Sequence, residues 1–127
     1  MKIIVMRILL ASFLVMAITG VAGAFVLLNT TGLKFMCIWL RPEGDPGWEP
    51  MTDIIVNLES NTPVMLPNNS YINIPAPYNT NRVRYLDLRC DLENGQSYVW
   101  PHIDFVSIYG LKINYNLKAE PIDSEKW

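Results

Sequence analysis

An uncharged apolar run near the N-terminus is the feature that most constrains this chain. Lys2 and Arg7 precede residues 8–28, a stretch that contains no charged side chain. A basic end followed by an apolar stretch is typical of an export signal or a membrane anchor. In both cases we expect the rest of the chain to lie on the far side of a membrane.

Two interpretations of this segment stay open. Ala22-Gly23-Ala24 is a small-x-small pattern that signal peptidase accepts, so residues 1–24 are predicted to be a cleaved signal peptide. The alternative is an uncleaved transmembrane anchor at 8–28, because about 20 apolar residues can cross the hydrocarbon core. Cleavage predicts a secreted or periplasmic protein. Retention predicts a single-pass membrane protein with its C-terminal domain outside the cytoplasm, and only then is membrane contact expected.

The remainder of the chain suits one small domain at 25–120, followed by a C-terminal tail at 121–127. Removal of the leader takes away Lys2 and Arg7 and no acidic residue, which changes the formal net charge from −2 to −4. Phosphate binding requires a basic surface. A nucleic-acid partner is therefore not expected.

Alternation of apolar and polar residues predicts strands along most of the domain. In residues 84–92, one face would carry Leu86, Leu88, Cys90 and Leu92 toward the core. Alternation also predicts strands at 53–59, with Ile54, Val56 and Leu58 inward, and at 111–119, with Leu111, Ile113, Tyr115 and Leu117 inward. Residues 33–40 are apolar on nearly both faces, which predicts a central strand, and 71–74 is predicted to be a short strand between prolines.

Turn residues separate the predicted strands, and Asn94-Gly95 predicts a type I′ hairpin after 84–92. About seven short strands at this spacing predict an all-β fold. The specific expectation is a small antiparallel β-sandwich, immunoglobulin-like in broad architecture, preceded by the N-terminal hydrophobic signal or anchor helix.

The two cysteines, Cys37 and Cys90, each fall on the predicted inward face of a strand. Disulfides persist in the compartments that an exported chain enters. We therefore predict one Cys37–Cys90 disulfide. A redox or metal pair would need a Cys-x-x-Cys spacing or further His and Cys ligands, and the sequence has neither.

Residues that could carry catalysis or bind metal are scarce. The single histidine, His102, would share a strand face with Asp104, but no serine lies in a nucleophile motif, so the protein is not expected to be an enzyme. Glu43, Asp45 and Glu49 lie in a loop that lacks the spacing of an EF-hand. We predict no metal site and no cofactor.

Aromatic residues beside prolines indicate a contact surface. Trp48, Tyr78 and Trp100 each lie close to a proline, and Arg82 and Arg84 follow the second of them. Trp, Tyr and Arg dominate the energetics of protein interfaces, and neighbouring prolines reduce the entropy lost when a loop is ordered. These five residues are the predicted partner-binding residues, and the predicted partner is another protein.

The leading hypothesis is an exported, non-catalytic protein-binding module, such as an inhibitor, an immunity protein, or a host-directed or adhesive protein. The alternative is an accessory subunit of a membrane complex, anchored by residues 8–28 with its β-domain outside the cytoplasm. An exported hydrolase that uses His102 and Asp104 is the third hypothesis.

Two Asn-x-Ser/Thr sequons begin at Asn29 and Asn68. They accept N-linked glycans only where the host carries out this modification. Asn68 lies in a predicted loop.

Overall fold

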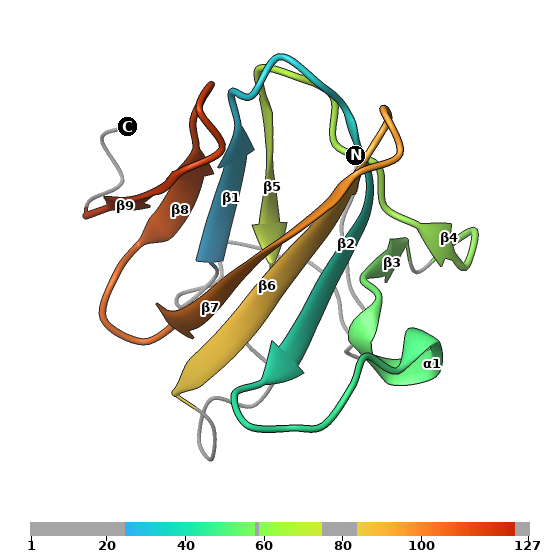
Figure 1. The fold of residues 1–127 in the computed structure, drawn as a ribbon, viewed down its shortest axis with the longest axis vertical. Helices are drawn as coiled ribbons and strands as arrows, with labels where there is room; N and C mark the ends of the chain where they lie inside the picture. The colour runs from blue at the N-terminus through green and yellow to red at the C-terminus, as the bar shows by residue number, and fades with distance from the viewer. Residues whose placement is uncertain (1–24, 58, 75–83, 124–127) are drawn as a thin grey trace.

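The computed structural model describes residues 25–57, 59–74 and 84–123. Over these residues the chain is all-β, as the sequence predicted, with only one short helix (Figure 1). The elements in chain order are β1 (Phe25–Asn29), β2 (Phe35–Pro42), α1 (Pro50–Asp53), β3 (Val56–Asn57), β4 (Thr62–Pro63), β5 (Ser70–Ile74), β6 (Tyr85–Leu92), β7 (Ser97–Asp104), β8 (Gly110–Ile113) and β9 (Ala119–Ile122).

The strands form two main sheets and one small ribbon. One sheet has the order β5-β1-β8-β9, the second has the order β2-β6-β7, and β3 pairs with β4 beside them (Figure 1). β1 and β8 run parallel, so the expectation of a wholly antiparallel arrangement is wrong at this pair. Parallel neighbours need a long connection. Here that connection includes all of the second sheet.

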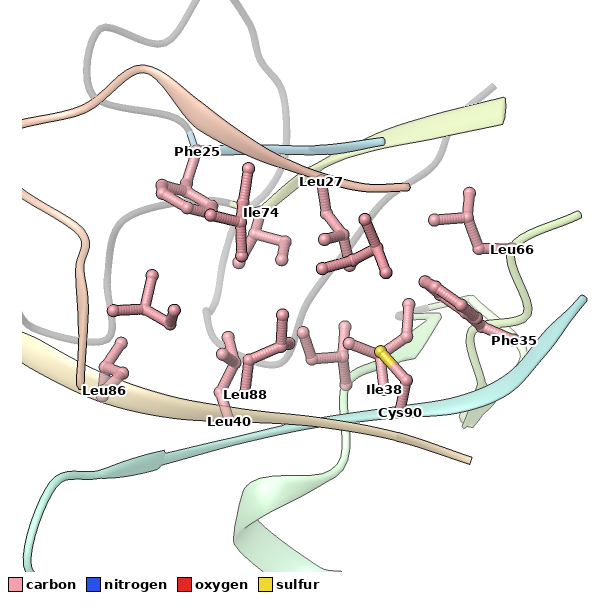
Figure 2. Close-up of a cluster of buried hydrophobic side chains, with 14 of the residues drawn as sticks. Phe25, Leu27, Phe35, Ile38, Leu40, Leu66, Ile74, Leu86, Leu88 and Cys90 are labelled. Atoms are coloured by element: carbon pink, nitrogen blue, oxygen red, sulfur yellow. The ribbon is translucent and has the colours of Figure 1, made fainter. Parts of the chain in front are cut away.

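The hydrophobic core lies between the two main sheets (Figure 2). β1 contributes Phe25 and Leu27 from one side, and β2 contributes Ile38 and Leu40 from the other. Burial of one such side chain stabilises the fold by about 1.5–3 kcal/mol. The inward face predicted for residues 84–92 is confirmed, since none of its four members is more than 3% exposed: Leu86, Leu88, Cys90 and Leu92.

β1 comes from the end of the apolar run. It is an interior strand between β5 and β8, and the ring of Phe25 stacks on Phe105 with 3.9 Å between ring centroids. Residues 25–28, which the longer anchor at 8–28 would include, therefore belong to the β-domain. The predicted signal peptide at 1–24 lies outside the described residues. Among the residues that the structure describes, no helix has the length and apolar character needed to cross a membrane.

The strand predicted at 53–59 is mostly replaced by α1 and a two-residue strand, β3. Pro50 is the first residue of the helix, where its fixed φ favours a helical turn. The Asp53 carboxylate accepts the Glu49 N–H at 2.8 Å and closes this turn. The turn changes which apolar residues face inward: Ile55 is buried, at 1% exposure, whereas Ile54 and Val56 are half-buried.

The strand predicted at 111–119 is a hairpin of two short strands, β8 and β9. The Asn114 side chain accepts the N–H groups of Asn116 and Lys118, and Leu117 has a φ of 62°. These contacts stabilise a turn where an unbroken strand was expected, and Tyr115 is 78% exposed instead of inward. β9 carries the domain beyond residue 120, to the buried Ile122.

A hairpin joins β6 and β7 at Asn94-Gly95, as predicted, but the turn is not type I′. Only Gly95 of this pair has a positive φ, at 90°. The Gly95 N–H donates to the Leu92 carbonyl, and the Leu92 N–H donates to the Gln96 carbonyl. This pattern fits a type I turn followed by a left-handed glycine, the usual form of a three-residue hairpin loop.

Candidate functional site

The face of the β2–β6–β7 sheet that points away from the core is called the outer face below. Ile38 and Leu40 of β2 enter the core, so Trp39 and Arg41 project outward. The register places Trp39 opposite Arg89 of β6, and Arg41 opposite Asp87. Aromatic, basic and acidic side chains therefore alternate across this face.

Four of these side chains form the tryptophan–arginine cluster: Trp39, Arg41, Trp48 and Arg89. The guanidinium carbon of Arg89 lies 4.3 Å from the centre of the Trp39 ring, and Trp48 meets Trp39 edge-on with 6.0 Å between centroids. Trp39 is only 8% exposed although it faces away from the core, because these neighbours cover it. Each cation–π contact of this kind contributes about 0.5–1 kcal/mol.

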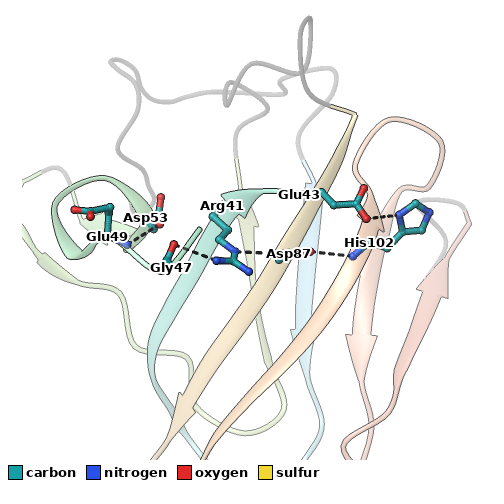
Figure 3. Close-up of polar contacts among 7 residues, drawn as sticks. All are labelled: Arg41, Glu43, Gly47, Glu49, Asp53, Asp87 and His102. Carbon is teal, nitrogen blue, oxygen red and sulfur yellow. Dashed lines mark hydrogen bonds and ion pairs between the residues drawn. The ribbon is translucent and has the colours of Figure 1, made fainter. Parts of the chain in front are cut away.

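Arg41 fixes the loop that carries Trp48. Its guanidinium carbon lies 4.4 Å from the centre of the Trp48 ring, and its Nη1 donates to the Gly47 carbonyl at 3.1 Å. Its Nε pairs with the buried Asp87 carboxylate at 3.2 Å (Figure 3). Trp48, predicted from the sequence as a loop contact residue, is therefore half-buried and held in place from the sheet.

Asp91 organises the other end of the cluster. Its carboxylate accepts hydrogen bonds from Trp39 Nε1 at 2.8 Å, Arg89 Nε at 3.0 Å and Ser97 Oγ at 2.6 Å. Partial burial opposes ionisation, but the hydrogen bonds from Ser97, Trp39 and Arg89 together outweigh it and lower the pKa of Asp91. Asp91 is thus a fixed anion that orients Trp39 and Arg89.

The predicted disulfide is wrong, because Cys37 and Cys90 are both free and lie on opposite faces of the sheet. A register shift between Phe35 and Cys37 reverses the expected alternation, so Phe35 and Ile38 both enter the core and Cys37 turns outward. Cys90 remains inward, opposite Ile38. Burial raises the pKa of the Cys37 thiol and raises that of Cys90 well above its usual value.

Thiol labelling tests this correction. After unfolding without reductant, both cysteines are expected to react with iodoacetamide, giving two additions by intact mass. In the folded protein Cys90, which is 0% exposed, is expected to stay unlabelled, and Cys37 to react slowly because the thiolate is the nucleophile. A reduced sample is the control. A mass without additions in the unreduced, unfolded sample would reinstate the disulfide.

His102 lies at an irregular point of β7. Its φ is 60°, and the β6–β7 register shifts close to it, between Leu86 and Leu88. The Asp87 carboxylate accepts the His102 N–H at 3.1 Å, and the imidazole stacks on Tyr85 with 4.0 Å between centroids. Nδ1 of His102 lies 2.8 Å from a Glu43 carboxylate oxygen (Figure 3).

Asp104, which was expected to share a strand face with His102, pairs instead with Arg84 at 3.0 Å. The hydrogen bond from Arg84 lowers the pKa of the Asp104 carboxyl. Arg84 Nη2 also donates to Ser107 Oγ. Arg84 was predicted to contact a partner, but within the fold it already binds the Asp104 carboxylate.

Trp100, another predicted contact residue, is not part of the cluster. Trp100 pairs with Leu88 and therefore points to the core side, where its Nε1 donates to the Leu117 carbonyl at 3.0 Å. Tyr78 and Arg82 lie outside the described residues. Of the predicted aromatic residues within the described ranges, only Trp48 lies at the outer face.

Carboxylates gather in the loop after β2, at Glu43, Asp45 and Glu49, and all three are exposed. Within the described ranges, no group of three or more His, Cys, Asp or Glu side chains has the arrangement needed to hold a metal ion. The outer face presents aromatic, basic and acidic side chains.

Comparisons of this chain with protein-family models, curated proteins and solved structures find no match.

Proposed function

We propose that this protein is an exported, non-catalytic protein-binding module whose contact surface is the outer face, with Trp48 near its centre. The supporting observation is the way Arg41 holds the Trp48 loop, through the ring contact and the hydrogen bond to Gly47. Tryptophan is among the residues that contribute most to binding, and a loop that is already ordered loses little entropy on association. Inhibitors, immunity proteins and adhesive or host-directed proteins belong to this class.

Exposed apolar side chains extend the surface around Trp48. Val99, opposite Arg89 on β7, is 48% exposed, and Met51 in α1 is 86% exposed. Interfaces combine an apolar centre with a polar rim. Val99, Trp48 and Met51 supply the apolar part, and the charged side chains of the outer face supply the rim.

The contacts of His102 support the non-catalytic part of the proposal. A histidine base needs a group that orients its ring toward a nucleophile. Glu43 is such a group, 2.8 Å from Nδ1, but the other described contact of the imidazole is the stacked ring of Tyr85, which is not a nucleophile, and Asp104 is engaged by Arg84. This arrangement suits a structural histidine at a strand irregularity.

The proposed location is secreted or periplasmic, with residues 1–24 as the signal peptide. The alternative of an anchored accessory subunit has less apolar chain available, since β1 takes residues 25–28 and leaves 8–24 for the span. That length is at the lower limit of about 17 residues.

The two facing sheets also support classification of the fold as a β-sandwich. Its similarity to the immunoglobulin-like architecture is only broad, because β1 and β8 are parallel.

Replacement of Trp48 tests the proposal. Trp48→Ala should weaken capture of a partner by the tagged chain at least tenfold, because loss of a central anchor costs about 2 kcal/mol or more of binding. Binding is measured with the partner recovered from the protein's native exported fraction. Tyr115→Ala is the matched control, since Tyr115 is 78% exposed and lies in the β8–β9 turn.

His102→Ala separates binding from catalysis and should leave capture unchanged. Equal capture by Trp48→Ala and the control would contradict the proposed surface. An activity that is lost with His102→Ala in a folded protein would point to an enzyme instead.

A further inference from the structure

We propose that the outer face docks a basic protein segment, whose lysine or arginine side chains pair with the loop at residues 43–49, called the acidic loop below. This inference rests on the proposed function and adds the chemistry of the partner. It is carried by the charge of the acidic loop, the apolar side chains beside it and the contacts that fix its shape.

The acidic loop carries negative charge that the described part of the outer face does not cancel. Glu43, Asp45 and Glu49 are exposed, and residues 43–49 contain no basic side chain. Glu43 contacts His102, which is charged only when protonated. The arginines nearby are already paired with other acids, as Arg41–Asp87, Arg84–Asp104 and Arg89–Asp91. A surface of this kind attracts cations and repels anionic partners.

Apolar side chains beside these carboxylates suit lysine and arginine in particular. Both side chains have an aliphatic stem that packs on apolar surface and a charged head that stays near water. Trp48 lies within the acidic loop and Met51, 86% exposed, follows it in α1. The stems would pack on Trp48 and Met51, while the charged heads pair with the loop carboxylates.

The acidic loop has a defined shape before any partner binds. The Asp45 N–H donates to the Pro42 carbonyl at 3.2 Å, the Gly47 carbonyl accepts from Arg41, and the Glu49 N–H donates to Asp53. Figure 3 shows the Glu49–Asp53 and Gly47–Arg41 contacts in a row with the Arg41–Asp87 pair. Because the backbone is held at several points, docking requires little further ordering of the loop.

The test uses the intact chain and a synthetic peptide rich in lysine and arginine, with a glutamate-rich peptide of the same length for comparison. Calorimetric titration should show binding of the basic peptide only, weakening at about 0.15 M ionic strength, where charges are screened beyond about 8 Å. The triple variant E43Q/D45N/E49Q should lose roughly tenfold or more in affinity, because it removes the charges and keeps similar side-chain shapes.

The matched control is E59Q/E93Q/E120Q, which removes three exposed acids elsewhere on the described surface and makes the same change in net charge. This variant should change the affinity by less than about twofold, since these three acids are not in the acidic loop. Equal losses in both triple variants would show attraction by net charge alone and overturn the inference. Preference for the glutamate-rich peptide would also overturn it.

Capture of the native partner separates this inference from the proposed function. If capture depends on Trp48 but is unchanged in E43Q/D45N/E49Q, the binding module stands and the basic partner is wrong. If both Trp48→Ala and E43Q/D45N/E49Q weaken capture while E59Q/E93Q/E120Q does not, the inference is supported.

Discussion

Gly110→Ala is expected to destabilise the protein by about 3 kcal/mol or more, and so to reduce the yield of folded protein. Gly110 is the first residue of β8 and pairs with Val26 in the parallel ladder. A Cβ atom at this position would overlap the Val26 carbonyl oxygen and lie 2.8 Å from the Val26 Cβ. Val26 is in an interior strand that is bonded on both sides, so its backbone has little freedom to move away.

Urea unfolding of the variant and the wild-type protein measures this cost. Gly44→Ala is the control, because a Cβ there meets no atom within 4 Å and only the positive φ of 96° opposes the substitution. That strain costs about 1–2 kcal/mol. If Gly110→Ala unfolds at the same urea concentration as wild type, the close β1–β8 approach described here is wrong.

Strand β6 could be predicted in detail, whereas β1 could not. Apolar and polar residues alternate throughout 86–92, so the apolar face was predicted to point inward. The structure places that face, which carries Leu86, Leu88, Cys90 and Leu92, in the core. Residues 25–28 are apolar on both faces of β1, and Val26 is as buried as Phe25 and Leu27. Local sequence does not distinguish such a strand from the end of an apolar leader.

The error at Cys37 has a different physical origin. Counting in steps of two from Phe35 places Cys37 inward, but the register shift between them moves Ile38 into the core instead. A bulge of this kind arises from pairing with a partner strand, here β6. Its position cannot be read from the sequence of β2 alone.

The candidate site was predicted only where its residues are local to one loop. Trp48 could be identified because prolines flank it. Trp39 and Arg41 are two residues apart on β2 and therefore share one face of that strand, while Arg89 lies on β6. The only indication in the sequence that these residues form a site is that each would face away from the core on its own strand. Their meeting depends on the β2–β6 register, which the sequence did not specify. Trp100 lies on the core side of β7, and the orientation of β7 relative to the core could not be read from the sequence.

Asn29 is a buried polar side chain whose hydrogen-bonding capacity is fully used. Its exposure is 0%, and its Nδ2 donates to the Leu33 and Leu66 carbonyls at 2.8 and 3.0 Å. Its Oδ1 accepts from the Thr31 N–H at 3.0 Å and the Thr31 hydroxyl at 2.8 Å. The sequon at Asn29 is therefore inaccessible to a glycan in the folded protein. Asn68, in the other sequon, lies in an exposed turn.

Asn29→Asp should destabilise the protein by about 3 kcal/mol or more at neutral pH, because a buried carboxylate oxygen would face two carbonyls where an amide now donates. Burial would raise the folded-state pKa of the new carboxyl above its unfolded value of about 3.9. The loss of unfolding free energy in the variant, relative to wild type, should therefore become smaller as the pH falls through that raised pKa, and larger again as the pH rises through it.

Urea unfolding at several pH values measures this deficit against wild type. Asn68→Asp is the matched control. Asn68 Oδ1 accepts the Gly32 N–H at 2.7 Å, and an aspartate retains that acceptor, so little change is expected. Similar stability of the two variants at pH 7, or a deficit in Asn29→Asp that does not change with pH, would contradict the donor role of Asn29. A deficit that shrinks in acid would show that Asn29 holds the turn after β1 to the segment before β5 through its two amide hydrogens.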